Sequence, residues 1–200
     1  GARRVLNITL EIAKENIMSQ AIHNLGGFGS VVLAKDFNQE FISAFEHINK
    51  REGVNISPLA GQSQVVNGIN FAFYCFVEQV TAPDLPKISN LELVTVYEKD
   101  GTYTQTSSRV ISEPVLFPPI GSFDSAALRA NFTDAEAQTA EQIESLVGVH
   151  YDILAAQQQV VAGLNFAFYA VVKPATLNGQ AYFAQINAYR NLEGKIERAE

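Results

Sequence analysis

The chain repeats itself at a shift of 95 residues, so that residue 64 matches residue 159. Without any gap, residues 26–77 and 121–172 share 22 identities in 52 positions. Unrelated segments of ordinary composition would share roughly 3 or 4. The period is much longer than that of a solenoid repeat, so each copy is expected to be a domain with its own hydrophobic core.

Prolines mark the place where the two copies join. Pro114, Pro118 and Pro119 lie close together in the chain and interrupt regular structure there. We therefore predict one repeat over residues 1–115 and a second over residues 116–200.

Composition restricts the kind of partner that the chain can bind. Apolar residues make up 47% of the chain and charged residues 18%, which favours packed cores over disorder. The formal net charge of -7 argues against nucleic acid as a partner, because phosphate binding needs a basic patch. The longest apolar run, residues 69–77, is only as long as a strand, so no membrane span is expected.

Each repeat predicts one amphipathic helix. In the first repeat, apolar residues at helical spacing cover residues 37–48, with Asp36 as the expected N-cap and Gly53 at the expected C-terminus. In the second repeat, residues 133–136 form a capping-box sequence, and Gly148 is the expected stop.

Extended segments follow each helix and predict an antiparallel sheet. They alternate aromatic and β-branched residues with small or polar ones, and glycine-containing turns separate them. The expected strands cover residues 54–62, 69–77 and 91–98 in the first repeat and residues 149–157, 164–172 and 183–190 in the second. Turns at residues 99–101 and 192–194 then lead into last strands. The predicted fold is α+β, with an antiparallel sheet wrapped around one helix in each repeat.

The predicted third element has two different faces. Alternation places Phe71, Phe73, Cys75 and Val77 on the face toward the helix. The opposite face carries Tyr74, so we expect part of that face to be covered, with scattered exposed aromatic residues as the alternative. Residues 5–12 form a spare amphipathic strand whose pairing partner the sequence does not identify.

One short motif occurs in both repeats between two predicted strands. Residues 64–68 read Gln-Val-Val-Asn-Gly and residues 159–163 read Gln-Val-Val-Ala-Gly. Both resemble the first-hairpin signature of the cystatin family, Gln-x-Val-x-Gly. Residues 25–27, Leu-Gly-Gly, also resemble the N-terminal segment of that family, and Gly121 stands at the matching position in the second repeat.

The resemblance covers roughly residues 25–112 and 120–200 and implies two tandem cystatin-like domains. It implies a non-covalent inhibitor that fills the active-site cleft of papain-like cysteine peptidases. Glycines would allow the backbone to approach the peptidase closely, and valines would supply compact apolar contacts. The peptidase-binding residues implied by the resemblance are Gln64, Val65, Val66, Asn67, Gly68, Gln159, Val160, Val161, Ala162, Gly163, Leu25, Gly26, Gly27 and Gly121.

The chain departs from the strongest inhibitors of that family in its second hairpin. Those inhibitors carry Pro-Trp there, whereas this chain has no Trp, and its corresponding turns, residues 99–101 and 192–194, read as polar. Losing an aromatic anchor can cost about 2 kcal/mol or more of binding free energy. The alternative is therefore a cystatin-fold binding or structural module without inhibition, in which the motif is only a good hairpin turn.

Nothing in the residue pattern indicates an enzyme, a metal site or a cofactor. Cys75 lies in the middle of an apolar strand and matches Ala170, so we expect a buried thiol rather than a nucleophile. The three histidines are far apart in the sequence, and no phosphate-binding loop is present. The chain begins Gly1-Ala2-Arg3-Arg4, as expected after removal of an export signal, so we expect a secreted or periplasmic protein. Oligomeric state is not indicated.

Overall fold

The structure is a computed structural model that describes residues 18–21, 27–115 and 121–197. Contacts divide the chain into two compact units. We call the first domain the unit of His23–Ser112 with Gln180–Phe183. The second domain is the unit of Glu113–Gly179 and Ala184–Glu200 together with the N-terminal segment Gly1–Ile22. The predicted strand over residues 5–12 lies outside the described residues.

The first domain is a five-stranded antiparallel sheet with one α-helix. Its sheet order is β2-β3-β4-β5-β6. The strands are β2 (Val32–Leu33), β3 (Val54–Val66), β4 (Gly68–Gln79), β5 (Ser89–Lys99) and β6 (Thr102–Val110). A 3-10 turn, η1 (Ala34–Asp36), precedes the helix α2 (Gln39–Phe45).

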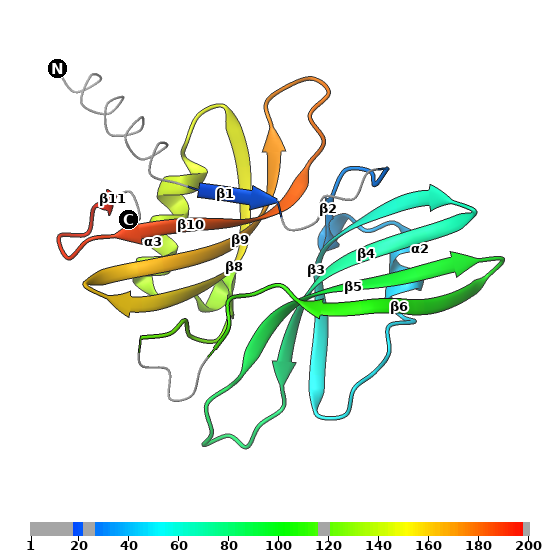
Figure 1. Ribbon diagram of the computed structural model, residues 1–200, viewed down its shortest axis with the longest axis horizontal. Helices are drawn as coiled ribbons and strands as arrows, with labels where there is room; N and C mark the ends of the chain where they lie inside the picture. Colours follow the sequence, from blue (N-terminus) through cyan, green and yellow to red (C-terminus); the bar gives the residue numbers. More distant parts are fainter. Residues whose placement is uncertain (1–17, 22–26, 116–120, 198–200) are drawn as a thin grey trace. The chain divides into compact units, whose positions relative to one another are not determined.

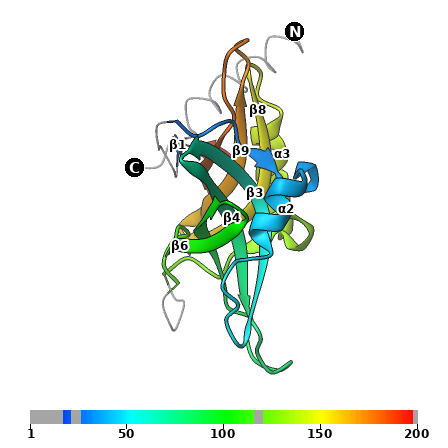
Figure 2. The same cartoon turned by 90° about the vertical axis from the view of Figure 1, so that its right-hand side faces the viewer.

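The second domain repeats this arrangement and adds one strand. Its sheet order is β1-β10-β9-β8-β7, and β11 also pairs with β10. The strands are β1 (Met18–Ala21), β7 (Ala127–Leu128), β8 (Val149–Val161), β9 (Gly163–Pro174), β10 (Tyr182–Arg190) and β11 (Ile196–Glu197). The turn η2 (Arg129–Asn131) precedes the helix α3 (Asp134–Glu144). The α+β class is confirmed, because the described residues form two antiparallel sheets with one α-helix beside each (Figure 2).

The helix ends follow local capping chemistry. In α3, the Thr133 hydroxyl accepts a hydrogen bond from the Glu136 amide, and the Glu136 carboxylate accepts one from the Thr133 amide, so the predicted capping box is confirmed. The prediction for α2 was wrong, because Asp36 lies in η1 and Asn38 caps the helix instead. Both helices also end earlier than predicted, at Phe45 and Glu144.

The first core lies between α2 and the inner face of the sheet. Phe41 packs edge-on against Phe71 and Phe73, with ring centroids 5.4 and 6.2 Å apart. Cys75 and Val77 belong to the same buried cluster, so the predicted inner face is confirmed. In the second domain, Phe166 and Phe168 stack at 5.3 Å in the equivalent place.

The outer face of each sheet is also buried at its centre, as the sequence predicted. Tyr74 and Tyr169 have no solvent-exposed surface. The Tyr74 ring stacks on Phe183, which groups with the first domain, at a centroid distance of 4.2 Å. The Tyr169 hydroxyl accepts a hydrogen bond from the Glu113 amide at 3.0 Å.

Candidate functional site

The two motif segments form the tips of the β3–β4 and β8–β9 hairpins (Figure 1). Val66 pairs with Gly68 across the first tip, and Val161 pairs with Gly163 across the second. The valines of both motifs are solvent-exposed, with 82% and 45% of Val65 and Val66 and 68% and 41% of Val160 and Val161 accessible. Asn67 and Ala162, between the paired residues, are exposed as well. Each tip therefore presents apolar side chains that the domain core does not use.

The motif glycines are required by contacts within each domain. Gly163 has φ +117°, and a Cβ there would lie 2.9 Å from the Tyr189 ring and would collide with the Arg190 carbonyl oxygen. Gly68 has φ +120°, and a Cβ there would lie 2.7 Å from the Tyr97 ring. Only glycine tolerates this combination of backbone angle and close approach.

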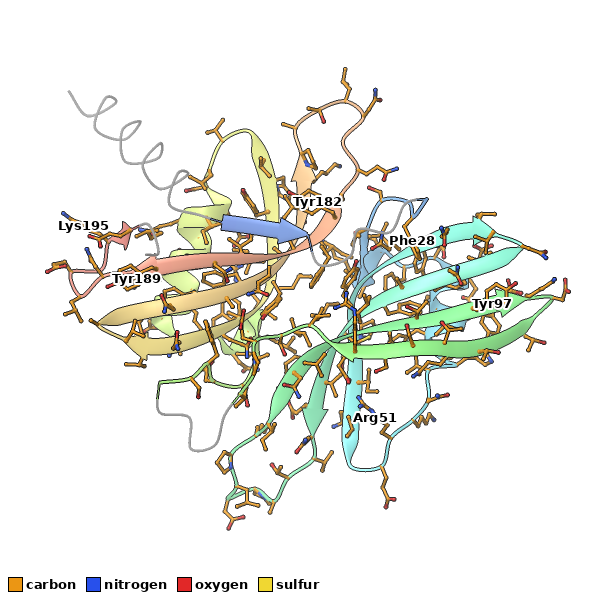
Figure 3. All side chains as sticks on the ribbon, viewed as in Figure 1. Phe28, Arg51, Tyr97, Tyr182, Tyr189 and Lys195 are labelled. Carbon is orange, nitrogen blue, oxygen red and sulfur yellow. The ribbon has the colours of Figure 1, made fainter. Side chains whose placement is uncertain are left out.

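A tyrosine on the neighbouring strand holds each hairpin tip. The Tyr97 hydroxyl donates a hydrogen bond to the Asn67 carbonyl, and the Tyr189 hydroxyl donates one to the Ala162 carbonyl. Figure 3 shows both tyrosines near the ends of β5 and β10. Sequence analysis did not single out these residues, although both stand at matching positions just before the last turn of their repeat.

The motif glutamine of the second domain connects its hairpin to the segment before η2 that contains Gly121 and Asp124. We call this segment the leader, and the segment around Gly27 is the leader of the first domain. Gln159 Nε2 donates to the Gly121 carbonyl at 2.8 Å, and Gln159 Oε1 accepts from Asn165 Nδ2 at 2.9 Å. These bonds hold Gly121 next to the hairpin.

The first domain shows the same arrangement around Gln64. Gln64 Oε1 accepts a hydrogen bond from Asn70 Nδ2 at 3.1 Å. A Cβ at Gly27 would lie 3.0 Å from Gln64 Nε2, so this leader glycine sits against the glutamine. The predicted contact residues Leu25 and Gly26 lie outside the described residues.

The last turn of each sheet lies beside the hairpin tip. Ile69 pairs with Glu98, which places the turn at residues 100–101 next to the first tip. In the second domain Arg190, beside Gly163, leads into a turn closed by two hydrogen bonds of 2.8 Å between Asn191 and Lys195. This turn is less polar than its sequence suggested, because the Leu192 side chain is 80% exposed on it.

The buried Gln157 side chain holds the second-domain leader through hydrogen bonds. Gln157 Nε2 donates to the carbonyls of Glu113 and Asp124 at 3.1 and 2.8 Å. Gln157 Oε1 accepts from the Glu113 amide at 3.0 Å and from the Tyr169 hydroxyl at 2.9 Å. In the part of the first domain that the structure describes, the corresponding Gln62 side chain makes two hydrogen bonds, accepting from the Tyr74 hydroxyl and donating to the Gly29 carbonyl. Burial raises the pKa of Tyr169, so its hydroxyl stays a donor.

Two carboxyl groups near this leader have raised pKa values. The pKa of Asp124 is raised to about 6, mainly by burial and to a smaller extent by the nearby Glu136 carboxylate, while the hydrogen bond from the Gln158 amide at 2.8 Å opposes the rise. Burial also raises the pKa of Glu136. Ionised Asp124 therefore destabilises the second domain at neutral pH.

We expect Asp124→Asn to stabilise the second domain at pH 7.5 and to leave its stability at pH 4 unchanged. The folded pKa of Asp124 lies above the usual value, so wild-type stability falls as pH rises from about 4 through about 6. Asparagine keeps the acceptor for the Gln158 amide and removes the charge. Because Asp124 is partly exposed, the gain should be only about 1 kcal/mol.

Urea unfolding of wild type and variant at both pH values would measure this difference. Asp84→Asn, at an exposed aspartate, is the control and should change neither value. A variant that is less stable than wild type at pH 7.5 would contradict the prediction.

The remaining reactive groups have structural surroundings. Cys75 is buried, and burial raises the pKa of its thiol, so the predicted core role is confirmed. Within the described residues, no three His, Cys, Asp or Glu side chains are grouped so as to hold a metal ion. No helix in the described part of the chain is long and apolar enough to cross a membrane.

No family model matches the chain, and no curated protein matches it in sequence.

Proposed function

We propose that the chain is a proteinaceous inhibitor of papain-like cysteine peptidases that fills the active-site cleft without forming a covalent bond. The contact surface is the tip of the second-domain hairpin, residues 159–163, together with the leader at Gly121. The observation that supports this proposal is the exposure of Val160 and Val161 on a hairpin tip that is hydrogen-bonded to the rest of its domain.

Rigidity matters because binding loses the conformational freedom of every group that becomes ordered. The hydrogen bonds from Tyr189 and Gln159 order the tip and the leader before any partner arrives. Valine side chains have few rotamers, so burying them in an interface loses little conformational entropy and keeps most of the free energy gained from apolar contact. The tip backbone is paired within the hairpin, so it would fill a substrate cleft without extending as a cleavable strand.

The second domain is proposed as the stronger inhibitory head. It carries apolar side chains on both adjacent turns, Val160 and Val161 on the hairpin and Leu192 on the last turn. In the first domain, the last turn presents the charged residues Lys99 and Asp100 instead. Buried apolar anchors carry most of the binding free energy in protein interfaces, so the first domain should bind more weakly.

We expect Val160→Asp to weaken the inhibition of papain by the full chain about 30-fold, which corresponds to a loss of about 2 kcal/mol. The side chain is 68% exposed, so stability should change by less than about 0.5 kcal/mol. Titration of papain activity, with circular dichroism as a folding check, measures both effects.

Val65→Asp in the first domain is the matched control, because it places the same charge at the equivalent exposed position. It should weaken inhibition much less. If the wild-type chain does not inhibit papain at micromolar concentration, the proposed inhibitory function is wrong.

One observation favours the second candidate, a cystatin-fold binding module that does not inhibit peptidases. Gly163, Gln159 and Tyr189 all make contacts within their own domain, so folding alone accounts for the glycine and the glutamine of the motif. Folding does not account for the exposed valines, which is why the inhibitor is the preferred proposal.

A further inference from the structure

Strand β1 comes from the N-terminal segment but completes the sheet of the second domain. It pairs antiparallel with β10, from Met18 opposite Asn187 to Ala21 opposite Ala184. In the chain, β1 precedes residues 26–77, the part of the first repeat that matches residues 121–172 of the second. The sheet of the second domain is therefore not built from the second repeat alone.

Comparison with the first domain shows which strand β1 replaces. There, β5 pairs along its length with the nine-residue strand β6, with Thr95 opposite Ser107 and Glu92 opposite Val110. Within the described residues, the corresponding strand β10 pairs with two residues of the last strand, β11, at Tyr189 and Arg190. Strand β1 occupies the remaining part of that position.

Without β1, the edge of β10 would be open to pairing with strands of other molecules. Ala184 and Ile186 of β10 have no exposed surface, and the β10 backbone at residues 184–187 would lose its hydrogen-bonding partners. An apolar sheet edge with free backbone groups recruits other strands.

Strand β1 is also held by little pairing. Among the residues that the structure describes, four pairs join β1 to β10, whereas twelve join β8 to β9. Local opening requires least free energy where the fewest contacts are broken, so β1 should separate from the sheet far more readily than the long central strands.

We propose that the β10 edge at residues 184–187 is a strand-acceptor site for a second copy of this chain. In the exchanged dimer, Met18–Ala21 of each copy pairs with β10 of the other. The exchanged dimer contains the same strand pairings as the monomer, so protein concentration and the freedom of the connecting residues decide between the two states. Reciprocal exchange closes at two copies and leaves no acceptor edge open. This proposal is independent of peptidase inhibition.

Cysteine pairs test the exchange directly in the full chain. The replacements are Met18→Cys and Asn187→Cys, made in a Cys75→Ala background because Ala170 is the natural counterpart of Cys75. Directly opposed residues of antiparallel strands lie close enough for a disulfide after small adjustments. A chain with both replacements reports on pairing within one copy. Two chains with one replacement each, refolded together from urea, can form this disulfide only by exchange.

We expect the mixed chains to yield a disulfide-linked heterodimer whose amount rises with protein concentration. The mismatched control replaces Asn187→Cys by Lys173→Cys, at an exposed β9 residue that pairs with His150. The matched pair should give at least about tenfold more linked dimer than this control.

If the double variant forms its internal disulfide but the mixed chains give no more dimer than the control, exchange does not occur. If the double variant forms none, β1 does not occupy this site, and the proposal fails as well. A dimer that these cysteines do not link would show a different interface and would also overturn it.

Discussion

Replacing Gly163 by alanine is expected to destabilise the second domain by about 3 kcal/mol and to abolish inhibition of papain. The backbone at Gly163 has φ +117°, which strains any residue with a Cβ. The added Cβ would also collide with the Arg190 carbonyl oxygen, which belongs to the sheet backbone and cannot rotate away. The hairpin tip must therefore separate from β10, and the Tyr189 bond to Ala162 should be lost with it. Hydrogen exchange of peptides from β8 and β9 measures the stability loss within the second domain.

Gly101→Ala is the control that separates collision from backbone strain. Gly101 has φ +80°, but no atom lies within 4 Å of a Cβ placed there. Its replacement should cost about 1 kcal/mol through backbone strain alone. If Gly163→Ala costs no more than Gly101→Ala, the close contact between the hairpin tip and β10 is not present in solution.

Local signals in the sequence predicted most of the fold. The capping box at Thr133 and Glu136 is a contact between residues three positions apart, so it can be recognised from the residue types alone. The inner face of β4 follows from alternation within one strand. Where two local signals compete, prediction is weaker. Asp36 and Asn38 are both good N-caps, and the 3-10 turn η1 decides between them.

Local residue patterns do not predict which strands pair when the strands are distant in the sequence. Alternation shows that a segment is a strand, but it does not show which edge the segment joins. Strand β1 illustrates this, because its partner β10 lies at the other end of the chain.

The sequence predicted the two hairpins that carry the motif but not the contacts that hold their tips. The motif marked both hairpins, and the exposed valines agree with a contact surface. The motif does not reveal that the Gln159 side chain bonds Gly121 and Asn165 within its own domain. No local pattern reveals such contacts, because they join residues that are distant in sequence.

Replacing Gln157 by leucine is expected to destabilise the second domain by about 3 kcal/mol, with weaker inhibition as a consequence. Leucine fills similar space but cannot bond the carbonyls of Glu113 and Asp124 or accept from the Tyr169 hydroxyl. Each buried polar group left without a partner costs about 1–3 kcal/mol. The leader would lose its hydrogen bond at the Asp124 carbonyl and become less ordered. Binding would then have to order the leader, and the conformational entropy lost in doing so would weaken affinity. Hydrogen exchange of the second domain and papain titration measure the two effects.

Gln62→Leu is the matched control in the first domain, and it tests whether the leader connects stability to inhibition. Among the described residues, Gln62 bonds Tyr74 and Gly29, so its loss leaves fewer groups unpaired and should cost about half as much. If the second domain is the stronger head, Gln62→Leu should leave inhibition nearly unchanged even though the first domain loses stability. Equal losses of inhibition from Gln62→Leu and Gln157→Leu would instead mean that both hairpin tips contribute, because each leader is held by the same kind of buried glutamine. A stable Gln157→Leu protein that inhibits as well as wild type would show that the leader does not need this anchor.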